Sequence, residues 1–257
     1  TGVSTVDIVG TNFGPADTVI TVTYGGSNGL KYSPSSCTTY CSPSSCSSSD
    51  TAHTHLRCTT VAGYGKDLKF IVTVASQSST LTSSTLDYAA PTITGLSSPT
   101  VYSTTAGGDT VTITGTGFGA ASHTDISATY GTFTATPCVW QSATSVQCDT
   151  VTGKGKDMKW RVTIGEQTSG LFATLTRYAV PTVSSITLTS DSVLSVTGGS
   201  TVDIVGTNFG PSGTPSITYG GSDGLKYAPS SCTMITANTK IRCPTIAGYG
   251  KDLKFIV

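Results

Sequence analysis

VDIVGTNFGP, residues 6–15, returns letter for letter at residues 202–211. A divergent copy, VTITGTGFGA, lies between them at residues 111–120. A period this long, roughly ninety to one hundred residues, is typical of separate small domains, because solenoid repeats measure only about 20–50 residues. We therefore interpret the chain as an array of domains, an arrangement that usually spans distance or displays a surface.

The two outer copies match each other better than either matches the middle one. Residues 25–37 return with two changes as residues 220–232, and residues 63–72 return intact as residues 248–257. The genetic repeat is therefore expected to be a pair of domains.

We divide the chain into three domains, residues 1–90, 91–180 and 181–257. The second and third open with a Pro-x-Ile/Val strand at Pro91 and Pro181, and the first has no such opening strand. The third ends at a valine after which the first domain continues, so it is expected to lack its last strands. These ragged ends suggest a window on a longer array.

Charge and composition exclude several classes of function. Lys plus Arg and Asp plus Glu number 14 each, so the net charge is +0 and only 11% of the residues are charged. A neutral chain is not expected to bind nucleic acid or anionic lipid. No run of about 18 apolar residues occurs, so direct membrane insertion of this segment is not expected. Abundant Ser, Thr and β-branched residues favour strands over helices.

The eight cysteines are distributed by domain. One pair per domain is given by Cys37 and Cys58, Cys138 and Cys148, and Cys232 and Cys243. The remaining two, Cys41 and Cys46, lie in a Ser-rich insert at residues 38–50. The even count favours disulfides, and hence a secreted protein in an extracellular or cell-surface setting. The alternative is a zinc site that adds His53 and His55, but the other two domains keep their pairs without further ligands.

Alternation of apolar and polar residues predicts strands with one buried face at residues 110–114 and 200–205. Further strands are expected at Ile20–Tyr24, Phe70–Val74 and Leu81–Tyr88, with counterparts at Ser127–Tyr130, Trp160–Ile164 and Leu171–Tyr178. Six or seven short strands in about ninety residues, without a helix, predict a β-sandwich.

The order of motifs makes the expectation more specific. Each domain runs from Gly-Gly through an alternating strand to Gly-x-Asn/Gly-Phe-Gly, then a Tyr-Gly strand, two cysteines, a Gly-x-Gly turn and a valine-rich strand. This order resembles the IPT/TIG domain, an immunoglobulin-like fold of plexins, transcription-factor dimerisation regions and large surface proteins. The resemblance implies an all-β fold, with tandem immunoglobulin-like β-sandwiches forming a semi-rigid array. Domains of this family serve as spacers, adhesion surfaces, dimerisation modules and accessories of glycan hydrolases.

No constellation of catalytic residues is apparent, so we expect no enzyme, no cofactor and no metal. The three histidines are His53, His55 and His123, of which the last is expected to be a solvated turn residue. Asp7 and Asp203 are expected to point outward from their strands. The recurrent Lys-Asp-x-Lys element is expected on the solvent face of a strand, with phosphate binding as the alternative.

Two Ser/Pro clusters in and beside the insert resemble O-glycosylated segments of extracellular proteins. Their residues are Ser33, Pro34, Ser35, Ser36, Ser42, Pro43, Ser44 and Ser45. The alternative is an undecorated loop, and mass spectrometry of glycopeptides from residues 31–57 distinguishes the two. Asn-x-Ser/Thr sequons do not occur.

The domain junctions are short and contain proline, which stiffens them. Their expected joint residues are Tyr88 and Pro91, then Tyr178 and Pro181. Each tyrosine packs either against the turns of the neighbouring domain or inside its own sandwich.

Two functions follow from this organisation. The first is a structural, non-catalytic segment of an extracellular filament, stalk or appendage that associates with neighbouring copies of itself. The second is an adhesion or receptor ectodomain with a protein or glycan partner. The second predicts an exposed aromatic patch, for which Val139-Trp140 and Trp160 are the candidates, although Trp160 aligns with Phe70 and Phe255 and is expected in the core.

Overall fold

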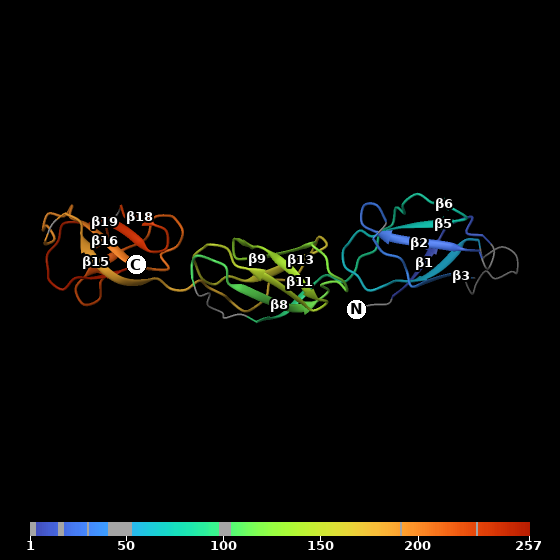
Figure 1. The fold of residues 1–257 in the computed structure, drawn as a ribbon, viewed down its shortest axis with the longest axis horizontal. Coiled ribbons are helices and arrows are strands. Elements are labelled where there is room, and N and C mark those ends of the chain that lie inside the picture. Colours follow the sequence, from blue (N-terminus) through green and yellow to red (C-terminus); the bar gives the residue numbers. More distant parts are fainter. Residues whose placement is uncertain are drawn as a thin grey trace.

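A computed structural model describes residues 4–14, 18–29, 31–40, 53–97, 104–190, 192–229 and 231–257. All regular elements in these ranges are β-strands, and the strands pair antiparallel. Three hydrophobic cores follow one another along the long axis, and we call the regions around them the first, middle and third units (Figure 1). The all-β, tandem organisation predicted from the sequence is confirmed. None of the described segments is a helix able to cross a membrane.

The middle unit is a sandwich of two four-stranded sheets. The first sheet has the order β11(Cys138–Ser142), β12(Ser145–Asp149), β8(Thr110–Thr116), β7(Thr92–Ser97). The second has the order β10(Phe133–Ala135), β9(Ile126–Tyr130), β13(Trp160–Ile164), β14(Gln167–Thr168). Alternate residues of β8 and β13 are buried between the sheets, as the period of two requires.

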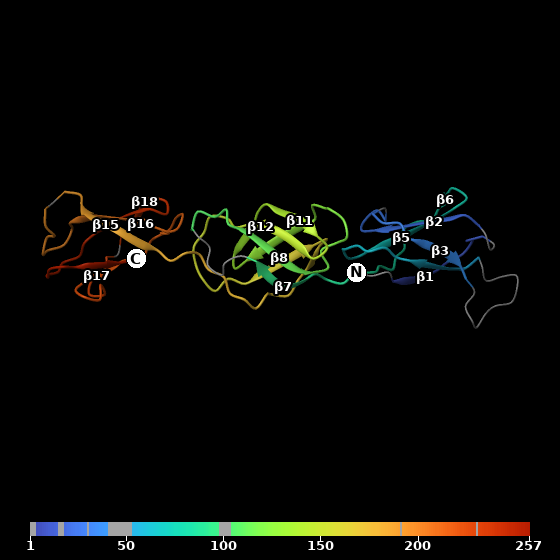
Figure 2. The ribbon, with the colours of Figure 1, turned by 60° about the horizontal axis from the view of Figure 1, so that its bottom comes forward.

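The outer units repeat this plan with fewer strands (Figure 2). The first unit has the sheets β1(Thr5–Val9), β4(His55–Thr59), β3(Ser36–Thr39) and β2(Ile20–Gly25), β5(Lys69–Val74), β6(Gln77–Ser78). The third has the sheets β15(Thr182–Leu188), β16(Thr201–Thr207), β19(Lys240–Pro244), β18(Thr233–Thr236) and β17(Thr218–Gly220), β20(Lys254–Ile256).

The strands expected at residues 81–88 and 171–178 are not formed, which corrects the sequence interpretation. Each segment runs alongside its sheet but makes only a bridge, Leu68 with Leu86 and Met158 with Thr176. Bends at residues 83–84 and 173–174 interrupt the pairing. Backbone bonds on both sides of the bend, such as Thr82 N–H to Phe70 O (3.1 Å), still hold the segment in place.

The repeated Gly-x-Asn/Gly-Phe-Gly element closes one end of each sandwich. Its phenylalanine is buried in all three copies, with exposures of 6% at Phe13, 0% at Phe118 and 6% at Phe209. The residue before each phenylalanine has a positive φ: 64° at Asn12, 78° at Gly117 and 60° at Asn208. Asn and Gly are the residues that tolerate this left-handed backbone, which explains why they alternate there.

Each unit contains a disulfide within one of its sheets. The bonds join Cys37 to Cys58, Cys138 to Cys148 and Cys232 to Cys243. In the first two, the bonded residues face each other directly on neighbouring strands. Cys41 and Cys46 lie outside the described residues, so their pairing stays a prediction.

The aspartates on the repeated strand form bidentate pairs with arginine. Asp7 and Arg57 are joined at 2.7 and 2.9 Å, and both are half-exposed. Asp203 binds Arg242 at 2.6 and 2.9 Å and Lys240 at 2.8 Å, and its side chain is only 8% exposed. Asp203 alternates along β16 with the core residues Val202 and Ile204 and therefore points outward, as expected, but its charged partners and the neighbouring strand β15 leave it little exposed.

Asp203→Asn is expected to destabilise the third unit by about 2 kcal/mol at neutral pH, because the hydrogen bonds of Arg242 and Lys240 then lose their charged acceptor. Arg242, then Lys240, lowers the pKa of Asp203 well below its usual range. Since folding lowers the pKa of Asp203, this stabilisation is present above about pH 4. It disappears as the pH falls through the pKa that Asp203 has in the folded protein. Hydrogen exchange of each unit along a pH series measures it.

The matched control is Asp7→Asn in the first unit. Arg57 lowers the pKa of Asp7 to about 2, so its contribution fades between roughly pH 4 and pH 2. We expect Asp7→Asn to destabilise its unit less than Asp203→Asn does, because water competes for the exposed Asp7–Arg57 pair. An equal loss from both substitutions would contradict the importance of burial by β15.

Candidate functional site at the joints between units

Tyr64 belongs to the first unit in sequence and to the core of the middle unit in space. It lies in the Gly63-Tyr64-Gly65 turn, is 7% exposed, and joins the middle unit's cluster of buried side chains. Its ring stacks on His123 with centroids 3.9 Å apart. Its hydroxyl donates to Asp125 Oδ2 at 3.0 Å. One side chain thus completes the packing of the next unit.

A lysine reinforces this contact. Lys31 Nζ lies 3.3 Å from Asp125 Oδ2 and 3.6 Å from the centroid of the Tyr64 ring, which combines an ion pair with a cation–π contact. The hydrogen bond from Tyr64, then Lys31, lowers the pKa of Asp125. Burial, then Asp125, raises the pKa of Tyr64. Tyr64 therefore stays a neutral donor and Asp125 an ionised acceptor at neutral pH.

The backbone of the junction is fixed as well. Gln167 of the middle unit donates from Nε2 to the carbonyl of Tyr88 at 2.7 Å. Pro91 is buried, and a Cβ on Gly117 would lie 3.0 Å from its Cα. The side chain of Tyr88 closes its own sandwich, since its hydroxyl donates to Val61 O at 2.6 Å. The ring of Tyr88 therefore packs inside its own sandwich and not against the turns of the neighbouring domain. Only its backbone carbonyl contacts the middle unit.

The second joint uses the same position with a different residue. Lys154 corresponds to Tyr64, and its Nζ donates to Ser212 O at 2.9 Å in the third unit. Its alkyl chain covers Gly210, whose Cβ would lie 2.8 Å from Lys154 Cδ. In both joints, the central residue of a Gly-x-Gly turn therefore contacts the Phe-Gly loop of the next unit.

Further contacts of the second joint are polar. Thr105 donates to Asn238 Oδ1 at 2.6 Å, and Asn208 Nδ2 donates to Val180 O at 3.2 Å. Tyr178 closes its own sandwich through a hydroxyl contact with Tyr130 at 2.7 Å. Pro181 is exposed. The second joint has no buried tyrosine comparable with Tyr64 among the described residues.

Tyr249 occupies the corresponding turn of the third unit and is 74% exposed. Lys226 Nζ lies 3.8 Å from its ring centroid, so the lysine–tyrosine pair of the first joint is formed again. The pair exists here without a docked unit among the described residues. It is a property of the repeat and not a consequence of docking.

A groove of about 950 Å³ runs beside the first joint, and charged side chains of both signs line it. Lys66 Nζ lies 3.8 Å from Asp67 and 3.9 Å from Glu166 across the joint. Asp67 has a φ of 53° and precedes β5, so Lys66 and Asp67 lie in a turn. The Lys-Asp-x-Lys element was expected on the solvent face of a strand, and this expectation is wrong for Lys66 and Asp67. The left-handed backbone of Asp67 is not compatible with an extended strand, so β5 begins only at Lys69.

His123, like Tyr64, Lys31 and Asp125, is a residue of the first joint that the sequence did not predict. It was expected to be solvated, yet it stacks on Tyr64 and its Nε2 lies 2.8 Å from Phe118 O. His55 packs edge-on against Tyr40, with centroids 5.6 Å apart. In the described part of the chain, no three His, Cys, Asp or Glu residues are placed to hold a metal. Cys41 and Cys46, which the zinc alternative requires, lie outside that part.

The remaining candidate residues are dispersed. Ser33, Ser35 and Ser36 are exposed and Pro34 is half-buried, while Ser42, Pro43, Ser44 and Ser45 lie outside the described residues, so O-glycosylation stays a prediction. Trp160 is fully buried, as expected. Trp140 is half-buried and donates from Nε1 to Phe118 O at 2.9 Å, and Val139 is 51% exposed.

Comparison with known proteins gives one family match. The family model of the IPT/TIG domain matches residues 91–178. No curated protein matches the sequence.

Several solved structures are similar at low identity. The plexin A4 extracellular region is 12% identical, with a TM-score of 0.32, and the match covers 99% of this chain but only 31% of plexin A4. SGBP-B from a xyloglucan utilization locus of Bacteroides uniformis is 14% identical, with a TM-score of 0.29 and coverage of 94% and 82%. InvD of Yersinia pseudotuberculosis is 14% identical, with a TM-score of 0.28 and coverage of 98% and 75%.

Proposed function

Since residues 91–178 form an IPT/TIG domain, we propose that the chain is a non-catalytic structural segment of an extracellular filament, stalk or cell-surface appendage. We propose further that its domains span residues 1–90, 91–180 and 181–257. The observation that carries it is the burial of Tyr64 of one unit in the core of the next. A spacer that must hold a direction needs its joints fixed in this way.

The chemistry of the first joint supports stiffness. A buried aromatic ring, an ion pair and a backbone hydrogen bond connect the two units at separate points. Rotation about the junction would break all three together, and no Gly/Ser-rich linker is present to absorb the motion. The second joint has hydrogen bonds from Lys154, Thr105 and Asn208, so we expect it to be softer.

The disulfides support the proposed compartment. Three units each contain a bond that a reducing cytosol would not maintain. A loop of about ten residues closed by a disulfide gains on the order of 2–3 kcal/mol, which suits a domain with a small core. We therefore place the protein outside the cell or on its surface, where neighbouring copies in a fibre are the proposed partners.

The groove beside the first joint favours a second candidate function, a receptor or adhesion segment. Its volume of about 950 Å³ and its mixed charges suit a polar partner such as a glycan or an extended peptide. Stiffness of the joint serves this function too, because it would hold the two walls of the groove at a constant separation.

Tyr64→Ala is the substitution that tests the proposed stiffness. We expect the distribution of distances between spin labels on the first and middle units to become broader and longer, because the ring, its hydrogen bond to Asp125 and its contact with Lys31 disappear together. Pulsed electron paramagnetic resonance on the whole chain measures this distribution.

Tyr249→Ala is the matched control, because it removes the same residue from an identical turn that is exposed. It should leave the distances between first and middle units unchanged. A parent distribution as broad as that of Tyr64→Ala would overturn the stiff-array proposal. Negative-stain microscopy of native material then separates the two functions, since ordered fibres support the filament and isolated rods support the receptor.

A further inference from the structure

The positive charges of the middle unit are concentrated in one stretch of its sequence. Within residues 91–180, all five lysines and arginines lie between positions 154 and 177, whereas the five acidic residues run from Asp109 to Glu166. Lys154 belongs to the second joint. The other four cations are exposed, and they are Lys156, Lys159, Arg161 and Arg177. A unit without net charge therefore gathers its cations around β13.

Two of these cations lie on the outer face of the sheet that contains β13. Trp160 and Val162 are buried between the two sheets. Lys159 and Arg161 alternate with them along the chain, so both point outward. Positions two apart on a strand are separated by about 7 Å, so the two side chains leave the sheet next to each other.

Arg177 adds a third cation to the same face. It lies between Thr176 and Tyr178, which are both buried. Thr176 forms a bridge with Met158, the residue before Lys159. Arg177 is therefore on the outer side of the segment that runs alongside β13.

Hydroxyl groups occupy the neighbouring positions of this face. Arg161 lies opposite Thr129 of β9, and Thr129 lies opposite Thr134 of β10, so that the three exposed residues form a row across the sheet. A second row joins the exposed Ser127 to Thr163. None of the four strands of this sheet contains an acidic residue.

The four exposed cations also have no acidic partner within the described residues. The ion pairs found there use other cations, namely Lys31, Arg57, Lys66, Lys240 and Arg242. Asp157, which lies between Lys156 and Lys159 in sequence, takes part in none of these pairs. An anionic ligand would therefore not have to displace a carboxylate of the protein.

The first unit has the same strands here without the same charges. Ile71 occupies the position of Arg161, as the pairing of both with a threonine on the neighbouring strand shows. Asp87 occupies the position of Arg177, so an acid replaces a cation. The lysines at the two remaining positions are kept as Lys66 and Lys69. The cationic face is thus a property of the middle unit and not of the repeat.

We propose that this outer face of the middle unit binds an acidic polysaccharide, a chain of sugars that carry carboxylates. The guanidinium groups of Arg161 and Arg177 pair with carboxylates through two parallel hydrogen bonds each. The hydroxyls of Thr129 and Thr134 beside them match the hydroxyl groups of sugars. A polymer presents many carboxylates, so it engages several of the four cations at once.

Other anionic partners fit this face less well. A protein partner is usually anchored by apolar or aromatic side chains at the centre of the interface. The exposed Leu171 and Leu175 lie on the flanking segment and not on the strands. Nucleic acid is not the expected ligand of a protein whose three disulfides indicate an oxidising compartment.

The face continues into the groove beside the first joint, because Ser127 and Thr163 also line that groove. The inference therefore names a ligand for the second candidate function, the receptor or adhesion segment, and rests on it. It does not depend on the stiffness of the joints. Polysaccharide binding and joint stiffness are measured by different experiments, so either can fail while the other holds.

Calorimetric titration of the intact 257-residue protein with polygalacturonate tests the face. We expect saturable binding that weakens strongly as the ionic strength rises from about 0.01 M to about 1 M, because the Debye length then falls from about 30 Å to about 3 Å. Dextran, a neutral polysaccharide, should not bind under the same conditions.

The double substitution Arg161→Ile and Arg177→Asp gives both positions the residues of the first unit. We expect the middle unit to keep its fold, which tryptophan fluorescence reports, since both of the chain's tryptophans lie in this unit. Binding of polygalacturonate should weaken roughly tenfold or more, because two charge-assisted contacts are lost. Lys159→Ala alone should weaken it severalfold.

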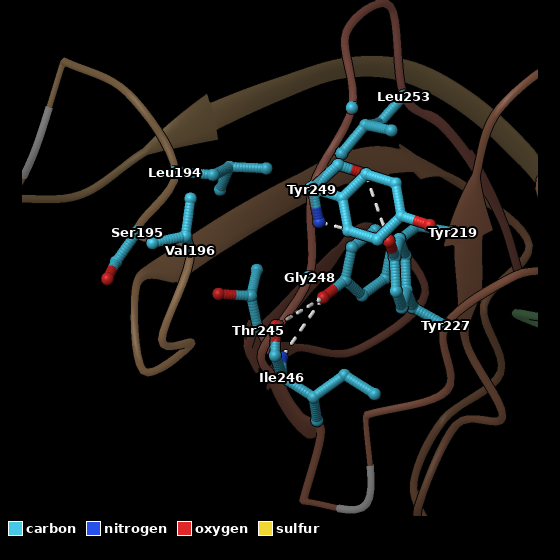
Figure 3. A pocket seen from close by; sticks show the side chains of 11 residues that line it. Leu194, Ser195, Val196, Tyr219, Tyr227, Thr245, Ile246, Gly248, Tyr249 and Leu253 are labelled. Atoms are coloured by element: carbon cyan, nitrogen blue, oxygen red, sulfur yellow. Dashed lines mark hydrogen bonds between the residues drawn. The ribbon is translucent and has the colours of Figure 1, made fainter.

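Lys254→Ala is the matched control, because Lys254 occupies the position of Lys159 in the third unit. Leu253 lines a pocket together with Tyr219 (Figure 3), and Phe255 packs against the third core. Lys254 lies between them and points outward, as Lys159 does. Its removal lowers the total charge by the same amount and should leave the affinity unchanged.

Three results would overturn the proposal. Equal losses for Lys159→Ala and Lys254→Ala would mean that the polymer responds to total charge and not to this face. Undiminished binding to the double variant would move the ligand to another surface, such as the groove, and would leave the receptor function standing. Binding to phosphatidylserine vesicles without binding to polygalacturonate would assign the face to a membrane.

Discussion

Trp160→Ala is expected to destabilise the middle unit by about 3–5 kcal/mol, the range for removing a large aromatic side chain from a core. Trp160 is fully buried on β13 and stacks on Tyr130, with centroids 4.6 Å apart. The cavity would not collapse easily, because Tyr130 is held by the Val151 N–H at 2.8 Å and by the hydroxyl of Tyr178. The loss therefore includes a cavity penalty and not only a transfer free energy.

Tryptophan fluorescence during urea unfolding measures this loss in the middle unit alone. The chain has two tryptophans, and both are in this unit, so Trp140 still reports after Trp160 is replaced. Trp160→Phe is the matched control, because Phe70 and Phe255 stack on the equivalent tyrosines at 5.0 and 4.8 Å. We expect a loss of less than half that of alanine. Similar losses for both variants would contradict a site that accepts either aromatic ring.

The alignment of Trp160 with Phe70 and Phe255 shows why the fold could be predicted from the sequence. The fold is indicated by local patterns, namely strand alternation, buried aromatic positions and glycine-rich turns. Each copy of the repeat contains these patterns. Agreement among three copies distinguishes a structural requirement from chance. The Asn/Gly alternation before the buried phenylalanine is an example, because only a positive φ explains both residues.

The joints could not be predicted in the same way. Residues 63–72 and 248–257 are identical, yet Tyr64 is 7% exposed and Tyr249 is 74% exposed. No local signal can distinguish two identical segments, because the difference is the presence of a neighbouring unit. His123 was missed for the same reason, since its stacking partner lies in another unit.

Strand pairing explains the remaining differences between the sequence expectations and the structure. Asp7 and Asp203 have identical sequence surroundings over residues 6–15 and 202–211, but β15 covers only the second. The segment at residues 81–88 has the composition of a strand, and its bends break the pairing that composition alone predicts. In each case tertiary context overrides a correct local preference.

Gly115→Ala is expected to destabilise the middle unit by about 3 kcal/mol or more, although it adds a single methyl group. Gly115 lies on β8 opposite the register shift in β7, and its Cβ would collide with the carbonyl oxygen of Thr92. The Phe118 ring blocks the other direction, with its Cζ 2.7 Å from the same Cβ. Backbone and a fully buried ring must both move, which close-packed interiors resist.

Gly170→Ala is the matched control within the same unit, because no atom lies within 4 Å of its added Cβ. Tryptophan fluorescence should show a change of no more than about 0.5 kcal/mol for it. Equal losses of stability for the two variants would mean that β7 moves away from β8 at little cost.

The added Cβ of Gly206 would meet the backbone of Thr182 and the Phe209 ring in the same way, whereas that of Gly10 would meet only the Phe13 ring. In the middle and third units, the first glycine of the repeat is therefore required by the opening strand as well as by the phenylalanine.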